Sequence, residues 1–183
     1  MEVNSQIMVI CKIGRKYKGE ENVRVRRKDR EVTDLDQIFD IVDRCSVAHL
    51  GMAAHGKPYV VALNFGYERN KDELILYFHS AKEGRKIEIL KENPEVCVQM
   101  HCSDALDPGK TGNPCAYGWR YDSVVGEGRV EFLEDLQEKT HALNCLMHHV
   151  GNMEEILHFP ETMLEQTCVF RLCIEKPVGK HRG

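Results

Sequence analysis

Five residues able to bind an anion lie within ten positions of one another, in the segment YFHSAKEGRK at 77–86. They are His79, Ser80, Lys82, Arg85 and Lys86. The segment begins with the apolar pattern of a strand and continues with the polar pattern of a helix, so these side chains gather where one gives way to the other. The start of a helix offers free N–H groups and a partial positive charge, to which nearby cations add. The segment therefore predicts a site for a dianion such as a phosphate monoester.

The spacing around Ser80 predicts how this helix begins. Ser80 and Glu83 are three residues apart, as in a capping box, which predicts Ser80 as the N-cap of a helix over about 81–92. Gly84 leaves the first turn without a side chain, so a ligand could approach the backbone there. The alternative stays open that the three cations form an ordinary solvated helix face, paired with neighbouring glutamates.

A second group, His141, Cys145 and His148 or His149, falls on one side of a predicted helix. Its spacing of i, i+4 and i+7 or i+8 can bind zinc or haem iron. The helix dipole also explains two histidines in a last turn, and Cys145 is explained as a small buried residue. We therefore assign no metal ligands.

The sequence assigns no catalytic residue. His49 and His55 could face a substrate, but such residues are more often ordinary core or surface histidines. The sequence contains no Ser-His-Asp block, no glycine-rich dinucleotide loop after a strand and no P-loop.

The elements that must position these residues are mostly strands. A capping box of Thr33 with Asp36 predicts a helix to about Cys45. Segments 47–53, 59–67 and 74–79 predict a three-strand antiparallel meander, because the turns between them are too short for crossovers. After the helix at 81–92, the segment EVCVQM predicts a strand at 95–100.

The second half predicts further strands around one helix. Residues 102–118 contain three Gly and two Pro and predict a long loop. A long strand over 119–133 is expected to bend at Gly126 and Gly128. A helix over 134–150 and a strand over 167–175 follow. The fold class is mainly β with a few helices, which suits a small closed or partly open barrel.

Composition limits the class of protein. The chain of 183 residues suits one domain, expected at 26–183 after an N-terminal extension at 1–25. Its net charge of −4 gives no general attraction for nucleic acid. No segment predicts a membrane span or an export signal, and the eight cysteines are expected to be reduced thiols, so a cytoplasmic location is expected.

Several blocks, in order, resemble a known family. They are RRKDRE at 26–31, PYVVALNFGY at 58–67, LYFHSAKEGRKIEIL at 76–90, YDSVVGEGRV at 121–130 and GK at 179–180. Together they resemble the pyridoxamine 5′-phosphate oxidase-like flavin-binding split barrels, especially proteins related to 5-nitroimidazole reductases. The resemblance covers about residues 26–180.

The resemblance implies a fold, a cofactor and a site. The fold would be a six-stranded antiparallel split β-barrel that forms a homodimer and binds FMN in two clefts at the subunit interface. Ser80, Arg85 and Lys86 would hold the FMN phosphate, with His79 beside them. The backbone at Val61, Ala62 and Asn64 would meet the polar edge of the flavin ring. Tyr121 and Ser123 would reach the cofactor from the neighbouring strand or subunit.

Two functions follow from this resemblance. The first is an FMN-dependent oxidoreductase that reduces a small electrophile, such as a nitroaromatic, a nitroimidazole or a quinone, with NAD(P)H as a possible donor. The flavin itself would carry the hydride, so no protein nucleophile is needed. The alternative is a non-catalytic module that binds flavin or haem for sensing or storage.

Overall fold

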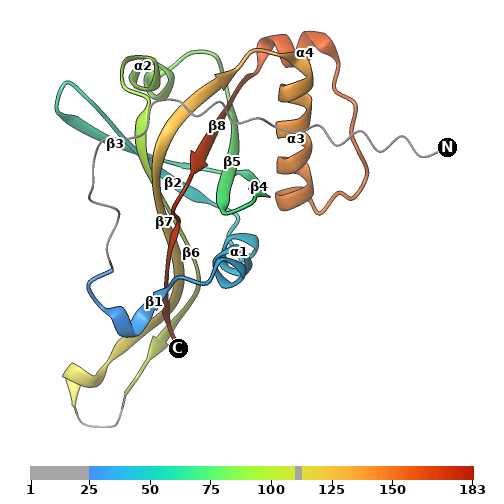
Figure 1. Ribbon diagram of the computed structural model, residues 1–183. Coiled ribbons are helices and arrows are strands. Elements are labelled where there is room, and N and C mark those ends of the chain that lie inside the picture. Colours follow the sequence, from blue (N-terminus) through green and yellow to red (C-terminus); the bar gives the residue numbers. More distant parts are fainter. Residues whose placement is uncertain (1–24, 110–112) are drawn as a thin grey trace.

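The computed structural model describes residues 25–109 and 113–183, so the predicted N-terminal extension lies almost wholly outside the described residues. In chain order the elements are η1 Lys28–Arg30, β1 Glu31–Val32, α1 Leu35–Arg44, β2 Ala48–Ala54, β3 Lys57–Leu63, β4 Gly66–Asn70, β5 Glu73–Ser80, α2 Arg85–Glu92, β6 Glu95–Asp107, η2 Pro114–Ala116, β7 Gly118–Leu133, α3 Leu136–Gly151, α4 Glu161–Gln166, β8 Cys168–Ile174 and β9 Val178–Arg182. Figure 1 shows α2 and α3 on different sides of the long strands between them.

The strands form one antiparallel sheet, in the order β3-β2-β6-β7-β8-β5-β4, with β9 pairing to β7 and β1. The mainly β class with a few helices is therefore confirmed. The described residues form nine strands, and the end strands β3 and β4 do not pair, so the path is not closed. The six-stranded barrel stays a prediction.

Strand β7 connects the two halves of the sheet, as its predicted length and bend suggested. One edge pairs with β6, while the other pairs with β9 over 121–125 and with β8 over 130–133. The change of partner occurs around Gly126 and Gly128. A Cβ on Gly128 would lie 2.4 Å from the Cys173 carbonyl oxygen. Strand β7 therefore passes so close to β8 that only glycine fits at position 128.

Helix α1 is confirmed, but the predicted capping box is wrong. Asp34 is the N-cap, and its Oδ1 accepts from the Gln37 N–H at 2.9 Å. An N-cap aspartate satisfies the same free N–H groups as a threonine would, so either residue can begin the helix. The helix buries Ile38, Ile41 and Val42 against the sheet.

The predicted three-strand meander is wrong. Its middle segment, 59–67, divides into β3 and β4, which lie at opposite ends of the sheet path. At the division Phe65 is fully buried, and a Cβ on Gly66 would lie 2.3 Å from the Leu146 nitrogen of α3. The apolar alternation continues through both strands, so it did not reveal the change of partner.

The predicted loop over 102–118 is also too long. Strand β6 continues to Asp107 and β7 begins at Gly118, with an irregular register between Cys102 and Ala105. The sequence prediction also lacked β1, β9 and α4. Both β1 and α4 are short, and β9 follows only a brief turn after β8.

Strand β5 is buried on both faces, because two apolar cores meet there. Leu74, Leu76 and Phe78 face the larger core with α1 and β6. Ile75 and Tyr77 face a second core, which α3 and α4 complete. This double burial fixes the carboxyl end of β5, from which the predicted phosphate segment continues.

Candidate functional site

The structure places the start of α2 four residues later than the capping-box prediction. Ser80 is the last residue of β5, and its hydroxyl donates to the Ala81 carbonyl at 2.8 Å. Gly84 is the N-cap, with φ of 115° and no side-chain cap. A Cβ on Gly84 would meet nothing within 4 Å, so the first turn of α2 is open to solvent on this side.

Three cations surround this uncapped helix start. Among the residues that the structure describes, none of Lys82, Arg85 and Lys86 forms an ion pair with a carboxylate. The alternative of a helix face paired with glutamates is therefore not supported. The Arg85 guanidinium lies over the Tyr59 ring of β3, 4.6 Å from its centroid, which joins α2 to the strand predicted to face a flavin.

Behind the cations, the charge of Lys86 acts on His79. Burial lowers the pKa of His79, and the charge of Lys86 lowers it further, so His79 favours the neutral form. Burial also lowers the pKa of Lys86. Ser80 stands opposite Cys168 of β8, whose pKa burial raises. The partly buried Lys86 ammonium thus lies among neutral groups.

A hollow of about 260 Å³ lies beside α2, next to Lys82 and between the helix and the start of β8. Its lining includes Lys82, Ile87 and Phe132, and also Lys139, which donates to the carbonyls of Leu164 and Thr167 at 3.0 and 3.2 Å. It is smaller than the roughly 300–1,000 Å³ typical of ligand pockets, so a ring system bound near α2 would lie on the open face of the sheet instead.

That face is formed by the outward side chains of β3, β2, β6 and β7. Ala62 stands opposite His49, which stands opposite Gln99. Residues directly opposite in antiparallel strands share a face, so these three form one row. Ala62 is exposed, and Val60 on the same strand is 62% exposed. The row presents an open, weakly polar surface.

The other two predicted residues of β3 lie differently. Val61 packs against the larger core, so only its backbone is available to a ligand. The Asn64 side chain donates to the Ser46 carbonyl at 2.9 Å and ties the end of β3 to the start of β2. Strand β3 pairs only with β2 in the described sheet, so its other edge carries unpaired backbone groups.

His49, which the sequence analysis named but did not assign to the site, lies on this face. Its ring stacks on His101 with centroids 5.8 Å apart, and its Nδ1 atom is buried without a hydrogen-bond partner in the described structure. An unsatisfied buried nitrogen is costly, so Nδ1 is expected to bind a partner outside the described residues. No sequence signal distinguishes His49 from an ordinary strand histidine.

Tyr121 and Ser123 form a separate part of the predicted site. Ser123 is buried opposite Lys180 of β9, and the Lys180 ammonium lies 5.3 Å from the Tyr121 ring centroid. Burial alone would raise the pKa of Tyr121, but Lys180 and Arg30 outweigh it and lower this pKa. Ser123 shares the outward face with Ala62, because its partner on β6 is His101, two residues from Gln99. Figure 1 shows this end of β7 at the opposite end from α2, so one chain does not bring the two groups together.

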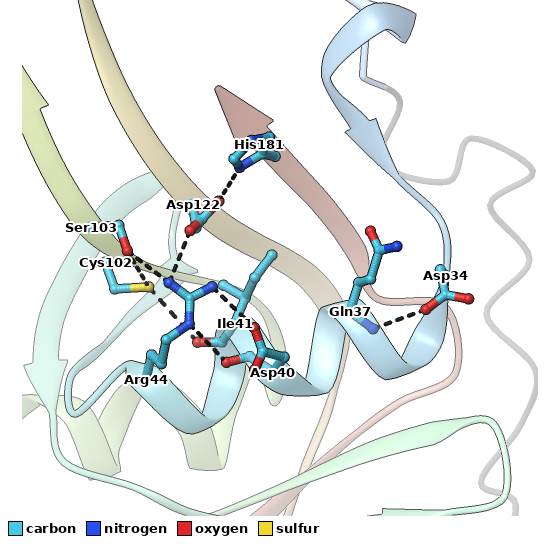
Figure 2. A network of polar contacts seen from close by, with 9 residues as sticks. All are labelled: Asp34, Gln37, Asp40, Ile41, Arg44, Cys102, Ser103, Asp122 and His181. Carbon is cyan, nitrogen blue, oxygen red and sulfur yellow. Dashed lines mark hydrogen bonds and ion pairs between the residues drawn. The ribbon is translucent and has the colours of Figure 1, made fainter. Parts of the chain in front are cut away.

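A charge network around the buried Asp122 fixes the strand between those two residues. Asp122 accepts from the Arg44 guanidinium at 2.9 Å, while its other oxygen lies 2.5 Å from Nδ1 of His181 (Figure 2). Burial would raise the pKa of Asp122, but these two partners lower it. Arg44 also donates to the Ser103 hydroxyl at 2.7 Å. The network links α1, β6, β7 and β9, and so orients Tyr121 and Ser123 on the other face of β7.

The family assignment follows from a direct comparison. Residues 34–181 match the family model described as pyridoxamine 5′-phosphate oxidase, which is most of the chain. This chain belongs to that family. The match spans all the predicted site residues, which lie in or beside β3, β5, α2 and β7.

Solved structures of the pyridoxamine 5′-phosphate oxidase type are similar over most of this chain. A candidate 5-nitroimidazole antibiotic resistance protein from Bacteroides thetaiotaomicron is 32% identical, with a TM-score of 0.70 over 82% of this chain and 85% of that one. The flavocytochrome Anf3 from Azotobacter vinelandii is 23% identical, with a TM-score of 0.73 over 90% of this chain and 75% of that one. A FAD-binding protein from Mesorhizobium loti is 27% identical, with a TM-score of 0.56 over 84% and 98% of the two chains. These likenesses fit a split barrel.

Two further observations concern curated relatives and membrane-spanning helices. A search of the curated proteins gives no match to the chain. Within the described ranges, no helix combines the length and the apolar character needed to cross a bilayer.

Proposed function

We propose that this protein binds FMN and uses it to reduce a small electrophile. The observation that carries the proposal is the start of α2, where three cations surround an uncapped, glycine-initiated helix and pair with no carboxylate among the described residues. A dianionic phosphate would supply the charge that these cations lack. Free N–H groups and the helix dipole would add to the attraction.

Each part of the predicted site has a task under this proposal. Arg85 and Lys86 bind the phosphate, and Gly84 lets it approach the backbone. The unpaired edge of β3 orients the polar edge of the ring, while the exposed Val60 and Ala62 provide an apolar surface. The ring of His49 lies on the same face, with its buried Nδ1 unsatisfied among the described residues.

When bound, FMN supplies the hydride chemistry, so the protein needs no nucleophile of its own. The substrate class that we propose is a nitroaromatic, a nitroimidazole or a quinone, with NAD(P)H as donor. The support is the likeness, at 32% identity over most of both chains, to the candidate 5-nitroimidazole resistance protein.

The first test is an absorbance spectrum of the purified protein, followed by anaerobic addition of NADH or NADPH. Flavin bands that bleach with a nicotinamide donor and return with a nitroaromatic or a quinone would support the reductase. Bands that bleach only with dithionite would favour the alternative, a non-catalytic flavin module. A colourless protein that takes up neither FMN nor FAD would overturn the proposal.

We also propose that the active form is a homodimer with an FMN cleft at each end of the interface. The support is the separation of the α2 cations from Tyr121 and Ser123 within one chain, together with the open face between them. A second chain would bring its own Tyr121 and Ser123 to the α2 of the first.

Subunit complementation tests the shared site. One variant carries Arg85→Ala with Lys86→Ala, and the other carries Tyr121→Ala with Ser123→Ala. Each variant alone is expected to lose FMN binding, because both of its clefts lack one half. Co-expressed chains should recover about one FMN per heterodimer, in the cleft formed by the two intact halves. No recovery in a purified heterodimer would contradict a shared site.

A further inference from the structure

A second group of polar side chains converges between β4 and α3, away from the proposed flavin site. The Glu68 Oε2 atom lies 2.8 Å from Nε2 of His141. The Cys145 sulfur lies 3.6 Å from the same Nε2 atom and 4.0 Å from the same Oε2 atom. Over the described ranges, this is the one group of three His, Cys, Asp or Glu residues whose potential ligand atoms all lie within 4.8 Å of one another.

The fold explains why these residues meet. His141 and Cys145 are four residues apart on α3, so they share one face of the helix. Gly66 allows that face to approach β4 closely, because any Cβ there would lie 2.5 Å from the Cys145 carbonyl carbon. Glu68 is two residues further along β4 and points to the same side of the strand. The contact that Gly66 permits therefore brings the carboxylate under the two helix residues.

The arrangement differs from that of a nucleophile with its base. In a Cys-His-acid relay, the acid binds one imidazole nitrogen while the thiol faces the other. Here the Glu68 carboxylate and the Cys145 sulfur approach the same nitrogen of His141. One potential ligand atom from each of the three residues therefore lies close to the other two, as ligand atoms do around a cation.

We propose that Glu68, His141 and Cys145 bind a zinc-type divalent metal ion. Zinc bonds of about 2.0–2.3 Å in a tetrahedron give ligand atoms that lie about 3.3–3.6 Å apart. The three observed separations, 2.8, 3.6 and 4.0 Å, lie around that range, so small side-chain movements complete the geometry. Carboxylate, imidazole and thiolate are all ordinary zinc ligands.

The surroundings suit such a site. The Tyr77 hydroxyl donates to the other Glu68 oxygen at 2.5 Å and orients the carboxylate. The Glu68 and His141 side chains are 25% and 34% exposed, which leaves a fourth position accessible to water or another ligand.

The other histidines of the group suggested by the sequence do not join this cluster. Nδ1 of His149 lies 2.8 Å from the Phe65 carbonyl oxygen, and His148 is exposed. The site is also independent of the flavin proposal, because α3 and α2 lie on different sides of the long strands (Figure 1). Either proposal could fail without the other.

Metal titration of the full chain, freed of metal with a chelator, tests the site. Binding should replace the His141 and Cys145 protons, releasing up to two protons per ion, and calorimetry in buffers of different ionisation enthalpy counts them. We expect one Zn²⁺ per chain by elemental analysis. We also expect Co²⁺ to give a sulfur-to-cobalt charge-transfer band. Wild-type protein that binds neither ion would overturn the proposal.

Variants identify the ligands. Cys145→Ser should abolish the charge-transfer band and weaken zinc binding at least about 100-fold, while Cys115→Ser, at an exposed cysteine on η2, should change neither. Tyr77→Phe keeps all three ligands and should weaken binding by about 10-fold, as loss of an orienting partner does. If Cys145→Ser does not fold, Glu68→Gln keeps the side-chain shape and should also weaken binding. An unchanged charge-transfer band in folded Cys145→Ser, or unchanged zinc affinity in folded Glu68→Gln, would overturn the assignment.

Discussion

Helices α1 and α2 both carry cations near one end, but at opposite ends: α1 carries Arg44 at its carboxyl end, and α2 carries its cations at its amino end. Arg44 lies in the last turn of α1, where the helix dipole favours a cation, and it pairs with Asp122 and Asp40. Lys82, Arg85 and Lys86 gather at the start of α2, where the dipole disfavours cations, and no described carboxylate pairs with them. The first arrangement is complete within the chain. The second is unfavourable by itself, and this difference supports the proposal that α2 binds an external anion.

The largest expected effect on FMN binding comes from removing the two α2 cations Arg85 and Lys86. Arg85→Ala with Lys86→Ala should weaken FMN binding at least about 100-fold, since each charged hydrogen bond typically contributes about 1.5–3 kcal/mol. Fluorescence quenching of titrated FMN measures the dissociation constant. Lys91→Ala, in the last turn of the same helix, is the matched control and should leave affinity within about threefold. Equal losses in the two variants would indicate a general charge effect instead of a phosphate site.

The network of Asp122 with Arg44 and His181 should contribute to the stability of the fold, whereas the α2 cations should contribute to ligand binding. Asp122→Ala removes the acceptor shared by Arg44 and His181, and should lower the free energy of unfolding by about 2–3 kcal/mol, less than a fully buried pair because Arg44 is partly exposed. Urea denaturation of the apoprotein measures this change. The Lys86→Ala variant should retain wild-type stability in the same assay. A stable Asp122→Ala protein would remove the contrast between the two regions.

The lowered pKa of Lys86 gives a pH dependence to FMN binding. A dianion binds the protonated amine, so affinity should fall as rising pH deprotonates Lys86. This fall should begin below the usual lysine pKa of about 10.4, because burial disfavours the charged form. Lys86→Arg keeps its charge at alkaline pH and should remove the early decline. Identical alkaline profiles for the two proteins would exclude Lys86 as the titrating group.

The smallest expected effect concerns the contact between α2 and β3. Tyr59→Leu removes the ring beneath Arg85 and should weaken FMN binding about threefold, because a partly exposed cation–π contact contributes about 0.5–1 kcal/mol. The same titration measures it. Tyr59→Phe keeps the ring face and serves as the control. A loss as large as that of the double cation variant would mean that Tyr59 itself contacts the ligand.

The sequence alone could predict those features that depend on residues close together along the chain. The cations around Gly84, the burial face of α1 and the bend of β7 all follow from local patterns. The N-cap of α2 could not be fixed, because Ser80 satisfies the capping spacing while β5 extends through it to pair with Cys168. The division at Phe65 and the stacking of His49 on His101 depend on strands distant in sequence. Glu68 was missed for the same reason, since it meets His141 only through the packing of α3 on β4.

The most direct test of the central claim compares FMN with riboflavin, which lacks the phosphate, on two proteins. Wild-type protein should bind FMN at least about 100-fold more tightly than riboflavin, since the α2 cations act on the phosphate alone. In Arg85→Ala with Lys86→Ala, that ratio should fall toward one while riboflavin affinity stays constant. A ratio unchanged by the two substitutions would contradict the assignment of α2 as the phosphate site.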